Sequence, residues 1–283
     1  PDDPQAYSHR GTEYSKKGDF VKAIADFDKV IELEPDDPQA YVRRGSAYSR
    51  NREFVKAIGD FDKAIELNPE DPDTIRERGW AQFSKGNSFK AIEDLTRAIE
   101  ADSKDATALN YRGQVLSGQS EWDKAIEDFD AAIKLKSKFY EAFCNRGSAR
   151  VGKGEVDEAA ADFDAAIKLN EQDALGHFLR GKLNAGTDVA KAIADFDAAI
   201  SRNSDYVEAY VLRSQMQLRQ AAWDQAIQDC NKVLELDPKN ADAHLSRGMA
   251  FNGKRQYDNA IKDFDWIDEQ KGPNAAPAAT RAD

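Results

Sequence analysis

The chain has few cysteines and no long apolar run. The only cysteines are Cys144 and Cys230, and they occupy non-equivalent places in the repeating pattern described below. A disulfide between them is therefore not expected, and the fold does not require an oxidising compartment. No apolar run approaches the ~20 residues that a membrane-spanning helix needs. The compartment stays open: the cytoplasm is favoured, and an exported form whose signal peptide has been removed is the alternative.

An excess of positive charge and the common catalytic motifs are also absent. The formal net charge is −12, which argues against nucleic acid or an anionic membrane as the main partner. No cluster of His, Cys or acidic residues has metal-ligand spacing, and there is no phosphate loop, nucleophile elbow or dinucleotide fingerprint. We therefore expect no catalytic residue, no metal site and no cofactor, and the chain is not expected to be an enzyme.

The sequence does contain a strict internal repeat. An Arg-Gly pair recurs every 34 residues, apart from one step of 33 residues, and Arg213-Ser214 fills the one gap between Arg180-Gly181 and Arg247-Gly248. A motif of the form Ala-Ile-x-Asp-Phe follows in the same phase, as at residues 23–27 and 260–264. A fixed period of this length indicates one supersecondary unit stacked many times.

Each repeat is expected to form two helices. Counting from Pro4 as the first position, the first repeat has apolar residues at helical spacing over about residues 5–17 and 20–33. An aspartate followed by proline opens repeats 1 to 3 and is typical of a helix start. Gly18, Gly86 and Gly154 indicate the turn between the two helices. The glycines of the Arg-Gly pairs predict close approach of the two helices, because glycine is otherwise costly inside a helix.

These residues resemble the tetratricopeptide repeat family. The second repeat shows the pattern as Gly45, Tyr48, Phe54, Ala57, Phe61, Ala64 and Pro69. The resemblance implies an all-α fold, a right-handed α-solenoid superhelix of antiparallel helix pairs. It implies eight repeats and a flexible C-terminal tail at residues 275–283. The repeats are residues 4–37, 38–71, 72–105, 106–139, 140–173, 174–206, 207–240 and 241–274, and the sixth is expected to have a shortened turn near residues 186–188.

All eight repeats carry an arginine at the seventh position and an aspartate at the twenty-third. We predict that they form a ladder of ion pairs within a repeat or between adjacent repeats, and a ligand-binding arginine track is the less favoured alternative. The arginines are Arg10, Arg44, Arg78, Arg112, Arg146, Arg180, Arg213 and Arg247, and the aspartates are Asp26, Asp60, Asp94, Asp128, Asp162, Asp195, Asp229 and Asp263.

The residues that differ between repeats lie on one face of the first helix, which in the family lines a concave, peptide-binding surface. Repeats 6 to 8 carry apolar residues there, and we predict that they form a contiguous binding groove. The groove residues are Phe178, Leu179, Val211, Leu212, Leu218, Leu245 and Met249. Repeats 1 to 5 supply a second, polar patch. The patch residues are Arg43, Arg50, Arg76, Trp80, Asn110, Tyr111 and Asn145.

The function that follows is a non-enzymatic scaffold that binds a peptide or a partner helix on the concave face. One alternative is a homo-oligomeric adaptor that associates through its C-terminal repeats, since the last repeat lacks an obvious polar capping helix after Gly272-Pro273. Another is the targeting region of a larger enzyme. The partner is expected to be a protein or peptide, including a second copy of the chain.

Overall fold

The computed structural model describes residues 3–271, and this range consists of sixteen α-helices with no strand. The predicted all-helical class is confirmed. The helices form two compact parts, one ending at Lys153 and the other beginning at Gly154. The N-terminal part contains α1 (Pro4–Lys16), α2 (Phe20–Leu33), α3 (Pro38–Arg50), α4 (Phe54–Leu67), α5 (Pro72–Ser84), α6 (Ser88–Ala101), α7 (Ala106–Gly118), α8 (Trp122–Leu135) and α9 (Tyr140–Lys153). The C-terminal part contains α10 (Val156–Leu169), α11 (Ala174–Asn184), α12 (Val189–Arg202), α13 (Val207–Arg219), α14 (Trp223–Leu236), α15 (Ala241–Gly253) and α16 (Tyr257–Lys271).

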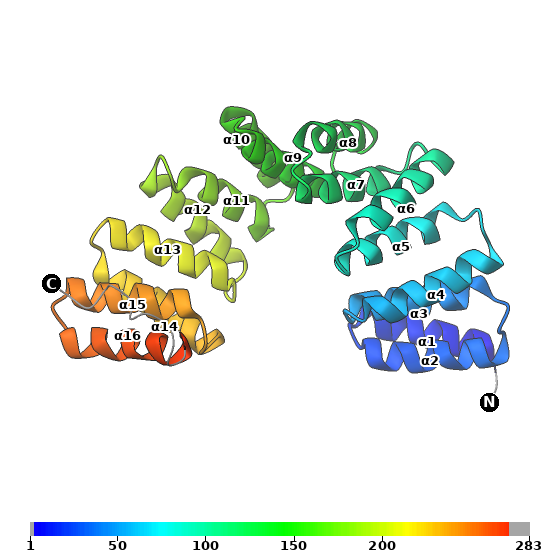
Figure 1. The fold of residues 1–283 in the computed structure, drawn as a ribbon, viewed down its shortest axis with the longest axis horizontal. Helices are drawn as coiled ribbons and strands as arrows, with labels where there is room; N and C mark the ends of the chain where they lie inside the picture. The colour runs from blue at the N-terminus through cyan, green and yellow to red at the C-terminus, as the bar shows by residue number, and fades with distance from the viewer. Residues whose placement is uncertain (1–2, 272–283) are drawn as a thin grey trace. The chain divides into compact units, whose positions relative to one another are not determined.

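Within each part, consecutive helices pack as antiparallel pairs that lie side by side (Figure 1). The odd-numbered helices are the first helices of the repeats, and the even-numbered helices are the second. None of the described helices combines the length and apolarity that crossing a bilayer requires. The expected tail, residues 275–283, lies outside the described residues.

The predicted helix starts are formed by aspartate and proline. The Asp3 carboxylate accepts a hydrogen bond from the Gln5 amide at 3.0 Å, and Asp37 accepts from the Gln39 amide at 2.9 Å. The proline that follows each aspartate lies in the first helical turn, where its missing N–H costs nothing. Asp71 differs, because its carboxylate accepts from the Thr74 hydroxyl and caps no backbone amide.

Glycine supplies the left-handed residue in three of the turns within repeats. Gly18, Gly86 and Gly154 have φ angles of +78°, +94° and +89°, a region that glycine enters without a Cβ penalty. In repeats 2, 4, 7 and 8 the same place is taken by non-glycine residues with φ between 56° and 61°, and these are Arg52, Ser120, Ala221 and Arg255.

The glycines inside the first helices do allow close helix approach. A Cβ on Gly113 would lie 2.6 Å from the Phe129 ring, and one on Gly11 would lie 2.8 Å from the Phe27 ring. Repeat 7 replaces this glycine with Ser214, and its partner position holds the smaller Cys230 instead of phenylalanine. The volume added on one helix is thus offset on the other.

The prediction of a shortened turn in repeat 6 is wrong. Helix α11 has 11 residues, whereas α13 has 13, and the connection to α12 spans residues 185–188. The deletion therefore shortens the C-terminal end of α11 instead of the turn. The Asp188 carboxylate accepts from the Lys191 amide at 3.0 Å and caps the start of α12.

Candidate functional site

The arginines and aspartates of the ladder lie in direct contact. In repeats 1 to 4 and 6 to 8, the arginine Nη2 and the aspartate Oδ1 of the same repeat are 2.6–2.7 Å apart. Nε donates to the second oxygen in repeats 1 to 4, 7 and 8, so that the pair is bidentate. In repeat 5, Arg146 contacts Asp130 at 2.5 Å, and Asp162 is buried.

A second partner of each arginine was missed by the sequence analysis. From repeat 2 onward, Nη1 reaches back to the twenty-fifth position of the preceding repeat. Arg44 Nη1 lies 2.6 Å from Asp28 Oδ1, for example, and Arg78 Nη1 lies 2.8 Å from Asp62 Oδ1. Thr96 and Asn231 take this place for Arg112 and Arg247. The ladder therefore joins the two helices of a repeat and also joins successive repeats.

In repeats 1, 2, 5 and 7, an aromatic residue at the fourth position lies at cation–π distance from the ladder arginine. The Arg44 guanidinium lies 5.7 Å from the Tyr41 ring centroid, which is cation–π distance. His244 replaces this aromatic residue in repeat 8, where its Nδ1 lies 2.8 Å from Asp263 Oδ1 and its ring stacks on Trp266 at 3.8 Å. His244 thus binds the ladder aspartate on one side and packs against Trp266 on the other.

The predicted apolar groove is only partly exposed, and the prediction is wrong for Phe178 and Val211. Each is 8% exposed. Phe178 packs against Phe196 and against Tyr206, whose ring centroid is 4.6 Å away. The fifth position of a repeat thus faces the neighbouring first helix, so an apolar residue there is buried by stacking.

The other groove residues divide into two groups. Leu179 and Leu212 are half-buried and pack on the core that contains Phe178, and Leu218 is also half-buried. Leu245 and Met249, on α15, are 38% and 49% exposed. Only this last pair offers substantial apolar surface.

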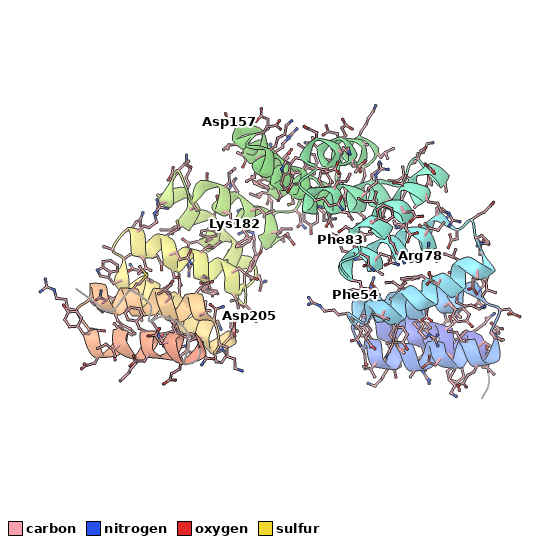
Figure 2. The ribbon with its side chains drawn as sticks, in the orientation of Figure 1. Phe54, Arg78, Phe83, Asp157, Lys182 and Asp205 are labelled. Carbon is pink, nitrogen blue, oxygen red and sulfur yellow. The ribbon has the colours of Figure 1, made fainter. Side chains whose placement is uncertain are left out.

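The polar patch contains an aromatic cluster. Trp80 of α5 stacks on Tyr111 of α7 with ring centroids 4.4 Å apart and an interplanar angle of 24°, and Phe83 lies 5.5 Å from Trp80. Trp80, Phe83 and Tyr111 are all half-buried. Phe83 lies near the C-terminal end of α5 (Figure 2). Burial raises the pKa of the Tyr111 hydroxyl, so this group stays protonated and can donate a hydrogen bond.

Arg76 has a structural role within the patch. Its Nη1 lies 2.6 Å from the carboxylate of Asp105. The other Asp105 oxygen accepts from the first backbone amides of α7. Asp73 and Glu77 complete a set of three carboxylates around this one guanidinium. Arg76 therefore joins α5 to the start of α7, and its charge is already matched.

The remaining patch residues lie on the first helices α3, α7 and α9. Asn145 Nδ2 donates to the buried Asn110 Oδ1 at 3.0 Å, which links α9 to α7. Arg43 is exposed and donates to the Ser8 hydroxyl. Arg50 is exposed too, and its charge acts on the Tyr111 hydroxyl. The N-terminal part thus presents stacked aromatic rings flanked by amides and by two exposed guanidinium groups.

Within residues 3–271, no three His, Cys, Asp or Glu side chains come together as a candidate metal site. The buried aspartates of the ladder face arginines, and the ladder holds them as acceptors of fixed hydrogen bonds.

Comparison with known proteins supports the repeat pattern. Family models described as tetratricopeptide repeat match residues 4–37, 38–71, 76–138, 144–188, 185–241 and 223–276. A crystal structure of MamA is 30% identical, with a TM-score of 0.51, and the match covers 60% of this chain and 92% of MamA. A tetratricopeptide repeat protein from Parabacteroides merdae is 20% identical with a TM-score of 0.69, over 88% of this chain and 99% of that one, and this likeness concerns the fold.

The curated relatives match over a short segment. Sperm-associated antigen 1 from Mus musculus is 36% identical over 56 residues, and the human protein is 38% identical over 58 residues. Each match covers 20% of this chain, and the chain spans only 6% of either relative. The family models, in contrast, match most of the chain in phase with the helix pairs and with the Arg-Asp ladder. The chain belongs to the tetratricopeptide repeat family, and as such it is a protein–protein interaction scaffold.

Proposed function

We propose that this scaffold binds an extended peptide segment of another protein on the first helices of the N-terminal part, at Trp80 and Tyr111, and that it is not an enzyme. The observation that carries the proposal is the stacked, half-buried aromatic pair. Such a pair offers a flat apolar surface for a proline, aliphatic or aromatic side chain of a ligand.

The repeat itself does not require these two aromatic residues. The ninth position, held by Trp80, is Thr12, Ser46, Gln114, Ser148, Lys182, Gln215 or Met249 in the other repeats. Tyr111, at the sixth position, is likewise the only aromatic residue at its place. A large side chain that the fold does not need, and that stays half-exposed, is available for binding.

The neighbouring groups favour a peptide as the ligand. Asn145 lies on α9, the first helix of the next repeat after that of Tyr111, and its side-chain amide can hydrogen-bond to a peptide backbone. Arg43 and Arg50 supply exposed positive charge on α3, so we expect acidic residues toward the end of the ligand that crosses α3. Because Arg76 is held by three carboxylates, it is not expected to contribute a free charge.

The test uses the full chain with Trp80 as its only tryptophan, made by replacing Trp122, Trp223 and Trp266 with phenylalanine. Peptides selected from a random display library against the unmodified chain are titrated into this variant. We expect the Trp80 fluorescence to change on binding. Burying one such ring is worth about 1.5–3 kcal/mol, so Trp80→Ala should weaken binding by roughly tenfold to a hundredfold.

The matched control is Leu245→Ala with Met249→Ala, which removes the two exposed apolar residues of α15. This control should bind the selected peptides as the unmodified chain does. Peptides whose binding leaves Trp80 fluorescence unchanged and is abolished by the control substitutions would contradict the proposal. They would place the binding site on repeats 7 and 8 instead.

Self-association through the C-terminal repeats is a second candidate, favoured by the exposure of Leu245 and Met249 and by Ile261, which is also exposed. The composition of the last helix of repeat 8 counts against self-association. Asp268 and Gln270 stand where the inner repeats 2, 4 and 5 carry isoleucine and leucine, so the last helix is less apolar than its equivalents. Sedimentation velocity over a hundredfold range of concentration tests this candidate, and a constant monomer would exclude it.

A further inference from the structure

The second helices of repeats 1 to 3 expose an apolar residue at the same position. Val21, Val55 and Phe89 are 70%, 67% and 81% exposed, and each lies in the first turn of its helix, α2, α4 or α6. The equivalent residues of repeats 4, 5, 7 and 8 are Asp123, Asp157, Asp224 and Asp258. The fold therefore accepts a charged residue here, and the apolar residues of three consecutive repeats have no role in folding that the others lack.

The charge of the same edge also differs between these repeats and the others. We define the turn edge as residues 17–22, 51–56 and 85–90, where the first helix ends and the second begins. Phe54 lies within it, and Phe83 lies just before its third segment (Figure 2). The turn edge carries six bases and two acids, whereas the equivalent residues of repeats 4, 5, 7 and 8 carry four bases and seven acids. A chain with a net charge of −12 thus concentrates positive charge around three exposed apolar side chains.

The six bases of the turn edge are all exposed, and most of their charge is uncompensated. Lys22 pairs with Asp19 at 2.6 Å and Lys56 pairs with Glu53 at 2.5 Å. The other bases form no ion pair among the described residues, and they are Lys17, Arg52, Lys85 and Lys90. The start of each second helix adds the partial positive charge of its free amides.

Gly59 is a second, independent feature beside this edge. It lies one turn after Val55 on the same face of α4, it is exposed, and a Cβ placed on it would meet nothing within 4 Å. A glycine inside an exposed helix weakens that helix, and no neighbour within the chain requires it. Close approach of another molecule to α4 would explain the missing side chain.

A hollow lies beside the same residues. It opens between α4, α5 and α6 with a volume of about 340 Å³. Its lining combines Ile58 with four bases (Arg78, Lys85, Lys90 and Arg97) and three carboxylates (Asp62, Glu93 and Asp94). Ile58 precedes Gly59 in the sequence, and Lys90 follows Phe89. The third segment of the turn edge, at Lys85 and Lys90, is therefore recessed.

We propose that the turn edge binds an acidic amphipathic segment of a partner protein, at a surface separate from the Trp80–Tyr111 site. The apolar side chains of the segment cover Val21, Val55 and Phe89, and its backbone approaches α4 at Gly59. Its carboxylates face Lys17, Arg52, Lys85 and Lys90. One ligand can thus satisfy both the exposed apolar surface and the unmatched charge.

An acidic membrane surface would share part of this chemistry, and two observations favour a protein segment. The net charge of −12 repels the chain from an anionic bilayer. Gly59 offers a place for close approach of a protein backbone, and a fluid lipid surface has no need of it.

The test compares the full chain with the triple variant Val21→Asp, Val55→Asp and Phe89→Asp. This variant places at the turn edge the residue that four other repeats already carry, so it is expected to fold and to melt like the unmodified chain. A random library of displayed 16-residue peptides is selected on the unmodified chain and counter-selected on the variant. The recovered peptides are then synthesised with a fluorescent label, and their Kd values are measured by anisotropy.

We expect recovered peptides that are rich in Asp and Glu at helical spacing with apolar residues, and a Kd at least tenfold weaker for the triple variant. The matched control, Val156→Asp with Ile261→Asp, also replaces exposed apolar residues of second helices and should bind normally. Trp80→Ala should bind normally too, which separates this surface from the site of the proposed function. Failure to recover any peptide that distinguishes the triple variant would overturn the proposal, as would peptides without acidic residues.

Two further arms sharpen the test. Gly59→Ala should raise the Tm, because the added methyl group meets no neighbour, and should weaken peptide binding at least fivefold. Unchanged binding with a higher Tm would contradict the role of Gly59 as a contact. Vesicles of phosphatidylserine and phosphatidylcholine should not sediment the chain, and sedimentation that the triple variant abolishes would overturn the protein partner in favour of a membrane.

Discussion

Removing one arginine of the ladder should destabilise the repeats on both sides of it. Arg44 donates to Asp60 of its own repeat through Nε and Nη2, and to Asp28 of the preceding repeat through Nη1. The side chains of Arg44 and Asp60 are 20% and 10% exposed, and that of Asp28 is 44% exposed. The change Arg44→Leu therefore leaves one nearly buried carboxylate and one half-exposed carboxylate without their donors.

The two partners should contribute unequally. Breaking a fully buried pair costs about 3–5 kcal/mol and breaking an exposed pair about 0–1 kcal/mol. We expect about 2–3 kcal/mol for Arg44→Leu, since the guanidinium retains some access to water. Asp28→Ala should cost less than 1 kcal/mol, on the order of other exposed pairs. Arg10→Leu is the control, because Arg10 is 57% exposed and has no preceding repeat among the described residues, and its effect should be smaller than that of Arg44→Leu.

The assay is urea unfolding followed by circular dichroism, with amide hydrogen exchange to locate the change. Because the stability of a repeat array is shared mainly between neighbours, lost protection should concentrate in α2, α3 and α4. Equal costs for Arg44→Leu and Arg10→Leu would refute the reasoning. So would an Asp28→Ala variant as unstable as Arg44→Leu, because burial would then not decide the cost.

Four smaller changes test other parts of the description by thermal melting. Gly113→Ala should lower the free energy of unfolding by about 1–3 kcal/mol through overpacking against Phe129, since the new Cβ would lie 2.6 Å from that ring. Ala221→Gly should raise it by about 1 kcal/mol, because Ala221 has a φ of 56°. Phe178→Ser should lower the free energy of unfolding by about 3 kcal/mol through loss of buried volume. An unchanged melting temperature would show that Phe178 is not buried. Burial, with the charges of Arg202 and Arg180 nearby, lowers the pKa of His177. The unfolded chain therefore binds a proton more readily than the folded chain, and the free energy of unfolding should fall as the pH drops through about 6.5. His177→Leu should remove this pH dependence.

The fold could be predicted because its causes are local and repeated. A proline after an aspartate, a glycine in the turn and a glycine opposite a phenylalanine each act within one repeat, and eight copies in phase leave little ambiguity. The exception is repeat 6, where a single deletion could be placed in either the turn or the helix. In the structure the deletion shortens α11, and the spacing of residues does not reveal which of the two elements takes it.

The candidate site was less predictable, because it depends on contacts between repeats. The fifth position looked like part of a variable surface, yet stacking of first helices buries Phe178 and Val211. The sequence offered one sign of this burial, the small side chains of Ser8 and Cys144 at the same position, and both are buried in the structure. The stacking of Trp80 on Tyr111 joins the ninth position of one repeat to the sixth of the next, so comparison of equivalent positions could not reveal it.

The most direct test of the central claim is the fluorescence titration of the variant whose only tryptophan is Trp80, using peptides selected on the unmodified chain. We expect a saturable change in Trp80 fluorescence for peptides that bind at this site. Tyr111→Ala should raise their Kd by at least tenfold, whereas Leu245→Ala with Met249→Ala should leave the Kd unchanged. Failure to recover any selected peptide whose saturable binding changes Trp80 fluorescence and is weakened by Tyr111→Ala would contradict the proposed site.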